Sequence, residues 1–289
     1  MKRRDFIKTT LAATSLAGLD AMVLKTGAAE PGAAQEYLEW RTYQLKTAAQ
    51  KRRVDEYLKN AYLPALNRLG CKPVGAFTVK DAAETTGFQV LLSGGKVKSV
   101  SEMKDAAQIS DLHVLIPYPS LAVFGAVASA LAGDEAYQKA ADAYLQAPKA
   151  DPAYARMESS LMLAFAGMPK IELQPFSMEK KPRMFELRIY EAHSEFKCQK
   201  KVEMFNQGEM QVMRDTGLGP VFYGHTLIGA KSPNMTYMLS AENKEEHEKH
   251  WKAFGGHAEW KRLQKLPEYA DTVSNITSIF LVPTDYSQI

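Results

Sequence analysis

Hydrophobic and polar positions along the chain pass through the same succession of patterns twice. Alternation of the two kinds of position predicts a β-strand, and apolar residues three and four apart predict a helix that buries one face. In the first half these patterns predict strands near 37–45, 73–79, 112–116 and 160–166, and helices near 50–69 and 119–145. In the second half they predict strands near 184–191, 220–229, 235–240 and 275–282, and helices near 196–216 and 243–266. The helix at 50–69 ends at Gly70, a residue suited to a left-handed cap, and Pro64 should bend it.

The two halves also align residue by residue, which indicates an internal duplication. Residues 39–43 (Glu-Trp-Arg-Thr-Tyr) align with residues 186–190 (Glu-Leu-Arg-Ile-Tyr) at an offset of 147. Further along the chain the offset falls to 123, which aligns Tyr137 with Trp260. The difference of about 24 residues predicts an insertion in the first copy, at about 78–111.

This duplication predicts an α+β protein made of two tandem ferredoxin-like (βαββαβ) domains. We expect the first domain over 35–174, a linker rich in proline and charge over 175–182, and the second domain over 183–289. A final offset of 115 places Phe165 on Phe280, so that both copies end in an apolar run.

The first strand of each copy has one apolar and one charged face, because successive side chains of a strand point in opposite directions. We expect the apolar face to lie under the helices, and its members are Leu38, Trp40 and Thr42 in one copy and Phe185, Leu187 and Ile189 in the other. The opposite face then carries Glu39, Arg41 and Tyr43 in one copy and Glu186, Arg188 and Tyr190 in the other.

The charged face should point away from the helices. Two sheets in one chain can cover each other, which predicts a dimeric α/β-barrel-like pseudo-dimer with a polar, charge-lined centre. Charges in such a centre must be paired, because an isolated buried charge is costly. Two interpretations remain open at this point. Each glutamate and arginine pair only with each other, or the arginines and tyrosines line a pocket that orients an anionic or enolic small molecule.

Histidines supply the other candidate chemistry. His113 and His225 lie on predicted strands, and they could serve as acid or base if they face the barrel interior. Residues 245–250 (Glu-Glu-His-Glu-Lys-His) place two histidines three residues apart, but the density of charge indicates a solvated helix face and we predict no metal site. The sequence contains no phosphate-binding loop, no dinucleotide fingerprint and no Gly-x-Ser-x-Gly elbow, so we predict no cofactor.

Four segments carry a resemblance to a known family. They are Tyr37-Leu38-Glu39-Trp40-Arg41-Thr42-Tyr43, Leu63-Pro64-Ala65-Leu66-Asn67-Arg68-Leu69-Gly70, Trp251-Lys252-Ala253-Phe254 and Glu259-Trp260. Together they resemble the NIPSNAP family across both halves of the chain. The resemblance implies a dimeric α/β-barrel fold, with the two tandem domains forming the barrel. It implies no fixed catalytic residues, so we assign none and leave open whether the chain is an enzyme.

Composition and the amino-terminal residues add an expected location. Residues 1–34 have a basic start, a mildly apolar stretch and small residues near a cleavage point, and Arg3-Arg4-Asp5-Phe6-Ile7-Lys8 is typical of twin-arginine export signals. We therefore expect a periplasmic or secreted protein. The formal net charge of +3 falls to +1 without this segment, so we expect no nucleic-acid partner. The longest later apolar stretch, Leu121 to Ala132, is too short to span a membrane, and a buried position or a contact between chains, as in a homo-oligomer, is the alternative.

The sequence leaves three classes of function open. The first is an exported protein that binds a small molecule or a partner through its barrel. The second is a cofactor-independent monooxygenase or isomerase, a possibility that rests on analogy of fold alone. The third is a structural or interaction protein without a pocket. A cavity that reaches Arg188, Tyr190 and His225 would favour the first two, and a filled centre would favour the third.

Overall fold

Each repeat folds into a four-stranded antiparallel sheet in the computed structural model, which describes residues 34–80, 97–99 and 110–289. The first sheet has the order β2-β4-β1-β5, and its strands are β1 (Tyr37–Gln44), β2 (Gly75–Val79), β4 (Leu112–Tyr118) and β5 (Arg156–Ala164). The second has the equivalent order β7-β8-β6-β9, and its strands are β6 (Met184–Glu191), β7 (Gly219–Ile228), β8 (Asn234–Ala241) and β9 (Asn275–Pro283).

The two sheets join at both edges into one closed, antiparallel, eight-stranded barrel. Strand β5 pairs with β7, where Leu163 lies opposite His225, and β2 pairs with β9, where Thr78 lies opposite Val282. A further short strand, β3 (Val97–Ser99), pairs in parallel with Ile276–Ser278 of β9, on the same edge of β9 as β2. It belongs to the predicted insertion at 78–111, most of which lies outside the described residues. Residues Ala33–Ile289 form one compact unit, so the repeats are halves of one barrel. Their division into independent domains at 174 and 183 stays a prediction.

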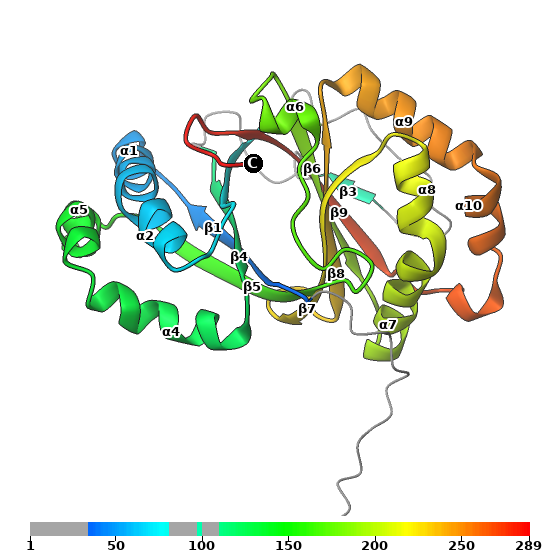
Figure 1. The fold of residues 1–289 in the computed structure, drawn as a ribbon, viewed down its shortest axis with the longest axis horizontal. Coiled ribbons are helices and arrows are strands. Elements are labelled where there is room, and N and C mark those ends of the chain that lie inside the picture. The colour runs from blue at the N-terminus through cyan, green and yellow to red at the C-terminus, as the bar shows by residue number, and fades with distance from the viewer. Residues whose placement is uncertain (1–33, 81–96, 100–109) are drawn as a thin grey trace, which may run out of the picture. The chain divides into compact units, whose positions relative to one another are not determined.

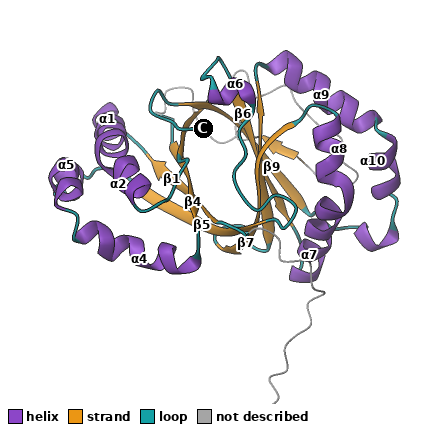
Figure 2. Cartoon of the chain, in the orientation of Figure 1, coloured by secondary structure: helices purple, strands orange, loops and turns teal. Residues whose placement is uncertain are grey.

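Helices cover the barrel on two sides, one repeat to each side (Figures 1 and 2). The helices of the first repeat are α1 (Ala48–Tyr57), η1 (Leu58–Tyr62), α2 (Leu63–Arg68), α4 (Leu121–Ala132) and α5 (Glu135–Leu145). Those of the second are α7 (Glu195–Met204), η3 (Phe205–Glu209), α8 (Met210–Asp215), α9 (Lys244–Gly256) and α10 (Ala258–Leu263). The linker forms one helical turn, α6 (Pro175–Met178), and a 3-10 turn, η4 (Pro267–Tyr269), precedes β9. None of the described helices is long and apolar enough to cross a membrane.

The first long helix of each repeat contains a π-helical turn at the same place. In the first repeat this turn is η1, and in the second it is η3, which lies 147 residues further along the chain. Pro64 follows η1, but Gln211 stands at the equivalent place in the second repeat, so the proline is not the cause of the irregularity. Both helices end near a glycine with positive φ, Gly70 at 80° and Gly217 at 84°. These shared irregularities confirm the register of the duplication.

Two details of the predicted layout are wrong. The helix expected over 119–145 is two helices, because the chain breaks at Gly133 and Asp134 caps α5 by accepting a hydrogen bond from the Tyr137 backbone N–H at 2.9 Å. The final offset is also wrong. Glu39 lies opposite Leu161, whereas Glu186 lies opposite Phe280, so the counterpart of Phe280 is Leu161 and not Phe165.

The assignment of the two faces of the first strands is inverted. The side chains inside the barrel are apolar and come from both repeats, and they include Leu38, Trp40, Phe77, Leu115, Phe185, Leu187, Phe222 and Leu281. The opposite face packs under the helices, since Tyr43 belongs to one sheet–helix core and Tyr190 to the other. The barrel therefore closes as predicted, but its centre is hydrophobic and the Glu-x-Arg-x-Tyr stripes lie between sheet and helices.

Candidate functional site

A buried network of polar side chains joins the sheet of the first repeat to its helices. The Glu39 carboxylate accepts hydrogen bonds at Oε1 from Arg41 Nε at 2.9 Å and Ser159 Oγ at 2.5 Å. Its other oxygen, Oε2, accepts one from the Tyr118 hydroxyl at 2.6 Å. The guanidinium of Arg41 lies over the ring of Tyr62, 5.1 Å from its centroid. Strand and helix thus both hold the Glu39–Arg41 pair.

The second repeat has the same pair on its sheet and different partners above it. Glu186 Oε1 accepts hydrogen bonds from Arg188 Nη1 and Ser278 Oγ, both at 2.6 Å. Its Oε2 lies 2.8 Å from His247 Nε2 and accepts a hydrogen bond from Trp251 Nε1 at 3.0 Å. The Trp251 ring also covers the guanidinium, whose Cζ lies 4.8 Å from the ring centroid. The Glu186–Arg188 pair and its helix partners His247 and Trp251 are all buried.

The repeat register identifies what replaces these two helix residues in the first repeat. Ser120 caps α4 and Asn243 caps α9, which fixes the offset between these helices at 123. Phe124 therefore stands where His247 stands in the second repeat, and Ala128 stands where Trp251 stands. A methyl group thus occupies the position of an indole, so the indole that covers Arg188 has no counterpart over Arg41.

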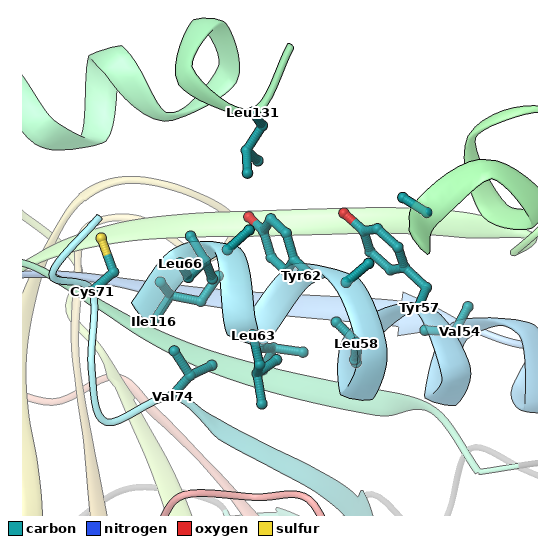
Figure 3. Packing of buried hydrophobic residues seen from close by; sticks show 14 of the residues in the cluster. Val54, Tyr57, Leu58, Tyr62, Leu63, Leu66, Cys71, Val74, Ile116 and Leu131 are labelled. Atoms are coloured by element: carbon teal, nitrogen blue, oxygen red, sulfur yellow. The ribbon is translucent and has the colours of Figure 1, made fainter. Parts of the chain in front are cut away.

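The space left by this exchange is a pocket of about 470 Å³ between the sheet and the helices of the first repeat. Its lining consists of Glu39, Arg41, Tyr57, Tyr62, Tyr118, Phe124, Val127, Ala128, Leu131, Ala132, Tyr137, Gln138 and Leu145. In Figure 3, Tyr57 and Tyr62 extend from the same helix with their hydroxyl groups toward the same side, and Leu131 of α4 points toward Tyr62. The side chain of Arg41 is 16% exposed, against 2% for Arg188, so only the first repeat offers its guanidinium to a ligand.

Electrostatics keep Arg41 charged and its neighbouring phenols neutral. Burial opposes the charge of Arg41, but the neighbouring phenols of Tyr62 and Tyr43 and the Glu39 carboxylate raise the arginine's pKa above its usual range. Burial is also the main reason why the pKa values of the Tyr62 and Tyr118 hydroxyls are raised. These tyrosines therefore stay neutral, and the Tyr118 hydroxyl donates its one proton to Glu39. One guanidinium and several neutral phenols form a surface suited to an oxyanion.

The structure separates the predicted site residues into four groups. Glu39 and Arg41 line the pocket, and Tyr43 supports them because Arg41 Nη1 lies 3.4 Å from its hydroxyl. Glu186, Arg188 and Tyr190 are buried under the helices of the second repeat, and the pocket of the first repeat does not reach them.

The side chains of His113 and His225 lie on opposite sides of the barrel wall. His113 faces the inside of the barrel, where its Nδ1 lies 3.0 Å from Thr42 Oγ1. His225 lies opposite Met235, a member of the sheet–helix core, so it faces away from the barrel interior. Burial lowers its pKa.

Sequence reasoning missed several residues of this layer. Tyr57, Tyr62 and Tyr137 reach the pocket from helices, and the signal that could have found the site is the replacement of Trp251 by Ala128 in the repeat register. The expectation of a solvated face at 245–250 is wrong for His247, which is 2% exposed. Within the described ranges, no group of three or more histidine, cysteine, aspartate or glutamate side chains could hold a metal ion.

The apolar segment at Leu121 to Ala132 is also less buried than predicted. It forms α4, which buries Val127 and Leu131 against the pocket and leaves Leu121 50% exposed. The short side chains at Ala122, Ala126 and Ala128 are exposed as well. This helix therefore forms an apolar outer wall of the pocket.

Comparison with known proteins identifies one family. Residues 185–288 match the model of the NIPSNAP family, so the second repeat is a NIPSNAP domain, as the sequence predicts. No curated protein matches the chain significantly. The solved NIPSNAP-like domain protein from Burkholderia xenovorans is 17% identical and covers 37% of this chain and 89% of its own, with a TM-score of 0.33.

Two further solved structures share the fold of the whole barrel. A candidate monooxygenase from Lactobacillus acidophilus is 10% identical and covers 86% of this chain and 94% of its own, with a TM-score of 0.53. A candidate monooxygenase from Fusobacterium nucleatum is 10% identical and covers 86% of this chain and 93% of its own, with a TM-score of 0.51. At this level of identity the similarity concerns the fold alone.

Proposed function

We propose that this chain, which carries a NIPSNAP domain over residues 185–288, binds a small anionic or enolic ring compound in the sheet–helix pocket of its first repeat. The observation that carries the proposal is the exchange of Trp251 for Ala128 over an otherwise equivalent glutamate–arginine pair. In the second repeat the indole covers Arg188, whereas in the first repeat Arg41 borders a pocket of about 470 Å³. A volume of this size lies within the usual range of roughly 300–1,000 Å³ for small-molecule sites.

The lining of the pocket determines the chemistry of its ligand. Aromatic rings and the apolar side chains of α4 favour a flat, apolar body. Arg41 and the neutral phenols favour a negatively charged oxygen at one end, because a hydrogen bond that involves an ionised group contributes more than a neutral one. Glu39 is already held by Arg41, Tyr118 and Ser159, so it orients the guanidinium and does not repel the ligand with an unpaired charge.

The test compares 2-naphthoate with its neutral analogue 2-naphthamide by isothermal titration calorimetry. We expect 2-naphthoate to bind more tightly than 2-naphthamide. Arg41→Met should reduce the ratio of the two affinities about tenfold or more, which is the effect of losing one charge-assisted hydrogen bond. Ala128→Trp should fill the pocket and abolish binding of both compounds. Leu227→Trp is the matched control, since Leu227 is exposed on β7 and away from the pocket lining. Binding that survives Ala128→Trp unchanged would refute the proposal.

A second candidate function follows from the same electrostatics. A guanidinium flanked by neutral phenols stabilises an enolate or phenolate, and such an electron-rich anion is the form of a substrate that reacts with dioxygen or isomerises. Cofactor-independent monooxygenase or isomerase activity is therefore the alternative to binding alone. Oxygen uptake with 1,3-dihydroxynaphthalene, measured with the intact protein and with Arg41→Met, tests the monooxygenase. Uptake that depends on Arg41 supports this activity, and none above background contradicts it; an isomerase would consume no dioxygen.

We also propose export through the twin-arginine route, on the sequence evidence alone. The segment that supports it, residues 1–34, lies outside the described residues except for its last position. Fractionation of cells that express the full chain should find the protein in the periplasm or medium, and Arg3→Lys together with Arg4→Lys should retain it in the cytoplasm. An unchanged distribution of the double variant would refute this route. A homo-oligomer stays a proposal as well, and the exposed apolar face of α4 is the surface that would serve it.

A further inference from the structure

We propose a second binding site at one mouth of the barrel, for a small uncharged polyhydroxylated molecule such as a monosaccharide. A cavity of about 570 Å³ opens there, separate from the sheet–helix pocket and with no lining residue in common. It is built from strands of both repeats, so neither repeat alone would form it. The proposal is independent of the function proposed above.

The floor of this cavity is apolar and rigid. Trp40, Met162, Ile189 and Ile279 line it from strands of both repeats. Trp40 makes stacked contacts with two other rings, with centroid distances of 6.1 Å to Phe77 and 5.3 Å to His113. An apolar floor of this kind suits the hydrophobic C–H face of a sugar ring.

The walls above the floor carry hydroxyl and amide groups in matched rows. In the first repeat Thr42 lies between His113 and Glu158 on adjacent strands. In the second repeat Ile189, at the equivalent position, lies between Thr236 and Thr277. Hydroxyl groups both donate and accept hydrogen bonds, which is the property that the hydroxyls of a sugar require of their partners.

These polar groups are held in place although they line an opening. The exposed fraction is 4% for Thr236 and 8% for Thr277. Thr236 Oγ1 lies 3.2 Å from Asn234 Oδ1, and Lys231 Nζ donates to Thr277 Oγ1 at 2.7 Å across the mouth. Buried polar groups with fixed geometry are a preorganised site, since little side-chain freedom remains to be lost on binding.

The charge of the mouth excludes the kind of ligand that the first pocket favours. Among the described residues that line it, Glu158 and Glu191 carry carboxylates and Lys231 carries an ammonium group. Lys231 lies 4.0 Å from Glu191 and is already held by Thr277. An anionic ligand would meet net repulsion here, so the two cavities differ in the charge of the molecule they accept.

The experiment measures saturation-transfer NMR and calorimetric binding of D-glucose, D-xylose and myo-inositol to the full chain, with D-gluconate as the anionic probe. We expect at least one neutral probe to bind and gluconate to bind more weakly than glucose. Thr236→Val with Thr277→Val keeps the shape and removes two hydroxyls, and it should weaken binding about tenfold or more. If that variant does not fold, Ile279→Trp, which occupies the floor, replaces it and should abolish binding.

Two controls keep this proposal distinct from the first. Ala128→Trp closes the sheet–helix pocket and should leave the binding of the neutral probe unchanged, while Ile279→Trp should leave the binding of 2-naphthoate unchanged. The proposal is overturned if none of the neutral probes shows saturable binding, which would make the mouth a hydrated surface. It is equally overturned if gluconate binds better than glucose, or if Ala128→Trp removes the binding of the neutral probe.

Discussion

Removal of the Trp251 side chain tests the difference between the two repeats most directly. Trp251 is 4% exposed and packs on Phe254, with ring centroids 5.3 Å apart. It covers Arg188 at 4.8 Å and donates a hydrogen bond to Glu186 at 3.0 Å. The variant Trp251→Ala makes the second repeat resemble the first at this position, because Ala128 is its counterpart. It should therefore open a cavity over Arg188.

The expected loss of stability is large. Truncation of a buried tryptophan to alanine typically costs about 3–5 kcal/mol, from lost transfer free energy and the cavity left behind. The lost hydrogen bond to a charged acceptor adds to this, but His247 still holds the same carboxylate oxygen at 2.8 Å, so the Glu186 charge keeps a partner. We expect a decrease of about 4 kcal/mol in the free energy of unfolding, a substantial part of the roughly 5–15 kcal/mol of an ordinary domain.

Urea denaturation measures this change in the free energy of unfolding. Unfolding is followed by far-ultraviolet circular dichroism, because the variant removes a tryptophan and so alters the fluorescence signal itself. The transition midpoint should fall while the slope m is unchanged. Trp251→Phe keeps an aromatic ring and loses only the N–H donor, so it should cost less than the alanine variant. In the first repeat Ala128→Gly should cost no more than about 1 kcal/mol, the difference in helix propensity.

A small effect of Trp251→Ala, below about 1 kcal/mol, would refute the reasoning because it lies outside the range for a packed buried tryptophan. The indole would then contribute no more than an exposed side chain. The contrast between a filled second repeat and an open first repeat would lose its basis, and with it the argument for a pocket over Arg41.

Three further predictions concern buried ionisable groups. Lys201→Met should destabilise the protein by about 3–5 kcal/mol in thermal or urea unfolding, because the buried Glu209 carboxylate, 2.8 Å from the Lys201 ammonium, loses its partner. The double variant Lys201→Met with Glu209→Leu should recover most of this loss, because it leaves no unpaired buried charge. Burial would raise the pKa of Glu186, but Arg188 and His247 outweigh it and lower the pKa, so the stabilisation by Glu186 is present above its unfolded pKa and is lost as pH falls through the folded value. The stability gap between wild type and Glu186→Gln should therefore narrow in urea titrations as pH falls below about 4, and a constant gap would contradict the lowered pKa. Cys71 and Cys198 are buried, and burial raises the pKa of both thiols to about 11, so iodoacetamide should label neither at neutral pH until the protein is unfolded, as mass spectrometry can show.

The order of strands and helices could be predicted from the sequence because the same succession of hydrophobic patterns occurs in both repeats. The strand at 184–191 is found at the predicted bounds, and the offset of 147 recovers even the two π-helical turns, which no propensity would indicate. The break at Gly133 could not be placed as readily, since a glycine within a helical pattern either continues or ends the helix.

The orientation of the first strands could not be predicted by the same route. Alternation shows that two sets of side chains face opposite ways, but in a covered barrel both sides of each strand are buried, so the pattern does not reveal which side is inside. The rule that polar residues face away from a helix layer fails here. The α9 helix provides hydrogen-bond partners for Glu186, namely His247 and Trp251, whereas the rings and aliphatic chains that fill the barrel provide none.

Only part of the candidate site could be predicted from the sequence, because a pattern does not show what surrounds a buried side chain. Glu39 and Arg41 stand out as a repeated charged pair on a strand. Tyr62 and Tyr118 do not, because an aromatic residue at a core-facing position usually packs in a core and carries no signal of its own. Their relevance depends on the empty volume beside them, which a sequence does not state.

The Glu39–Arg41 and Glu186–Arg188 pairs occupy equivalent positions, and a comparison of their surroundings indicates their role. A buried ion pair can often be replaced by apolar residues without loss of stability, so its presence on both sheets is weak evidence for a structural role alone. In the second repeat Trp251 and His247 join the pair, and Arg188 is closed off from solvent. In the first repeat these two helix residues are replaced and the guanidinium of Arg41 borders a cavity. The sheet chemistry is thus the same while the helix above it differs, which is the arrangement expected if one copy supports the barrel and the other receives a ligand.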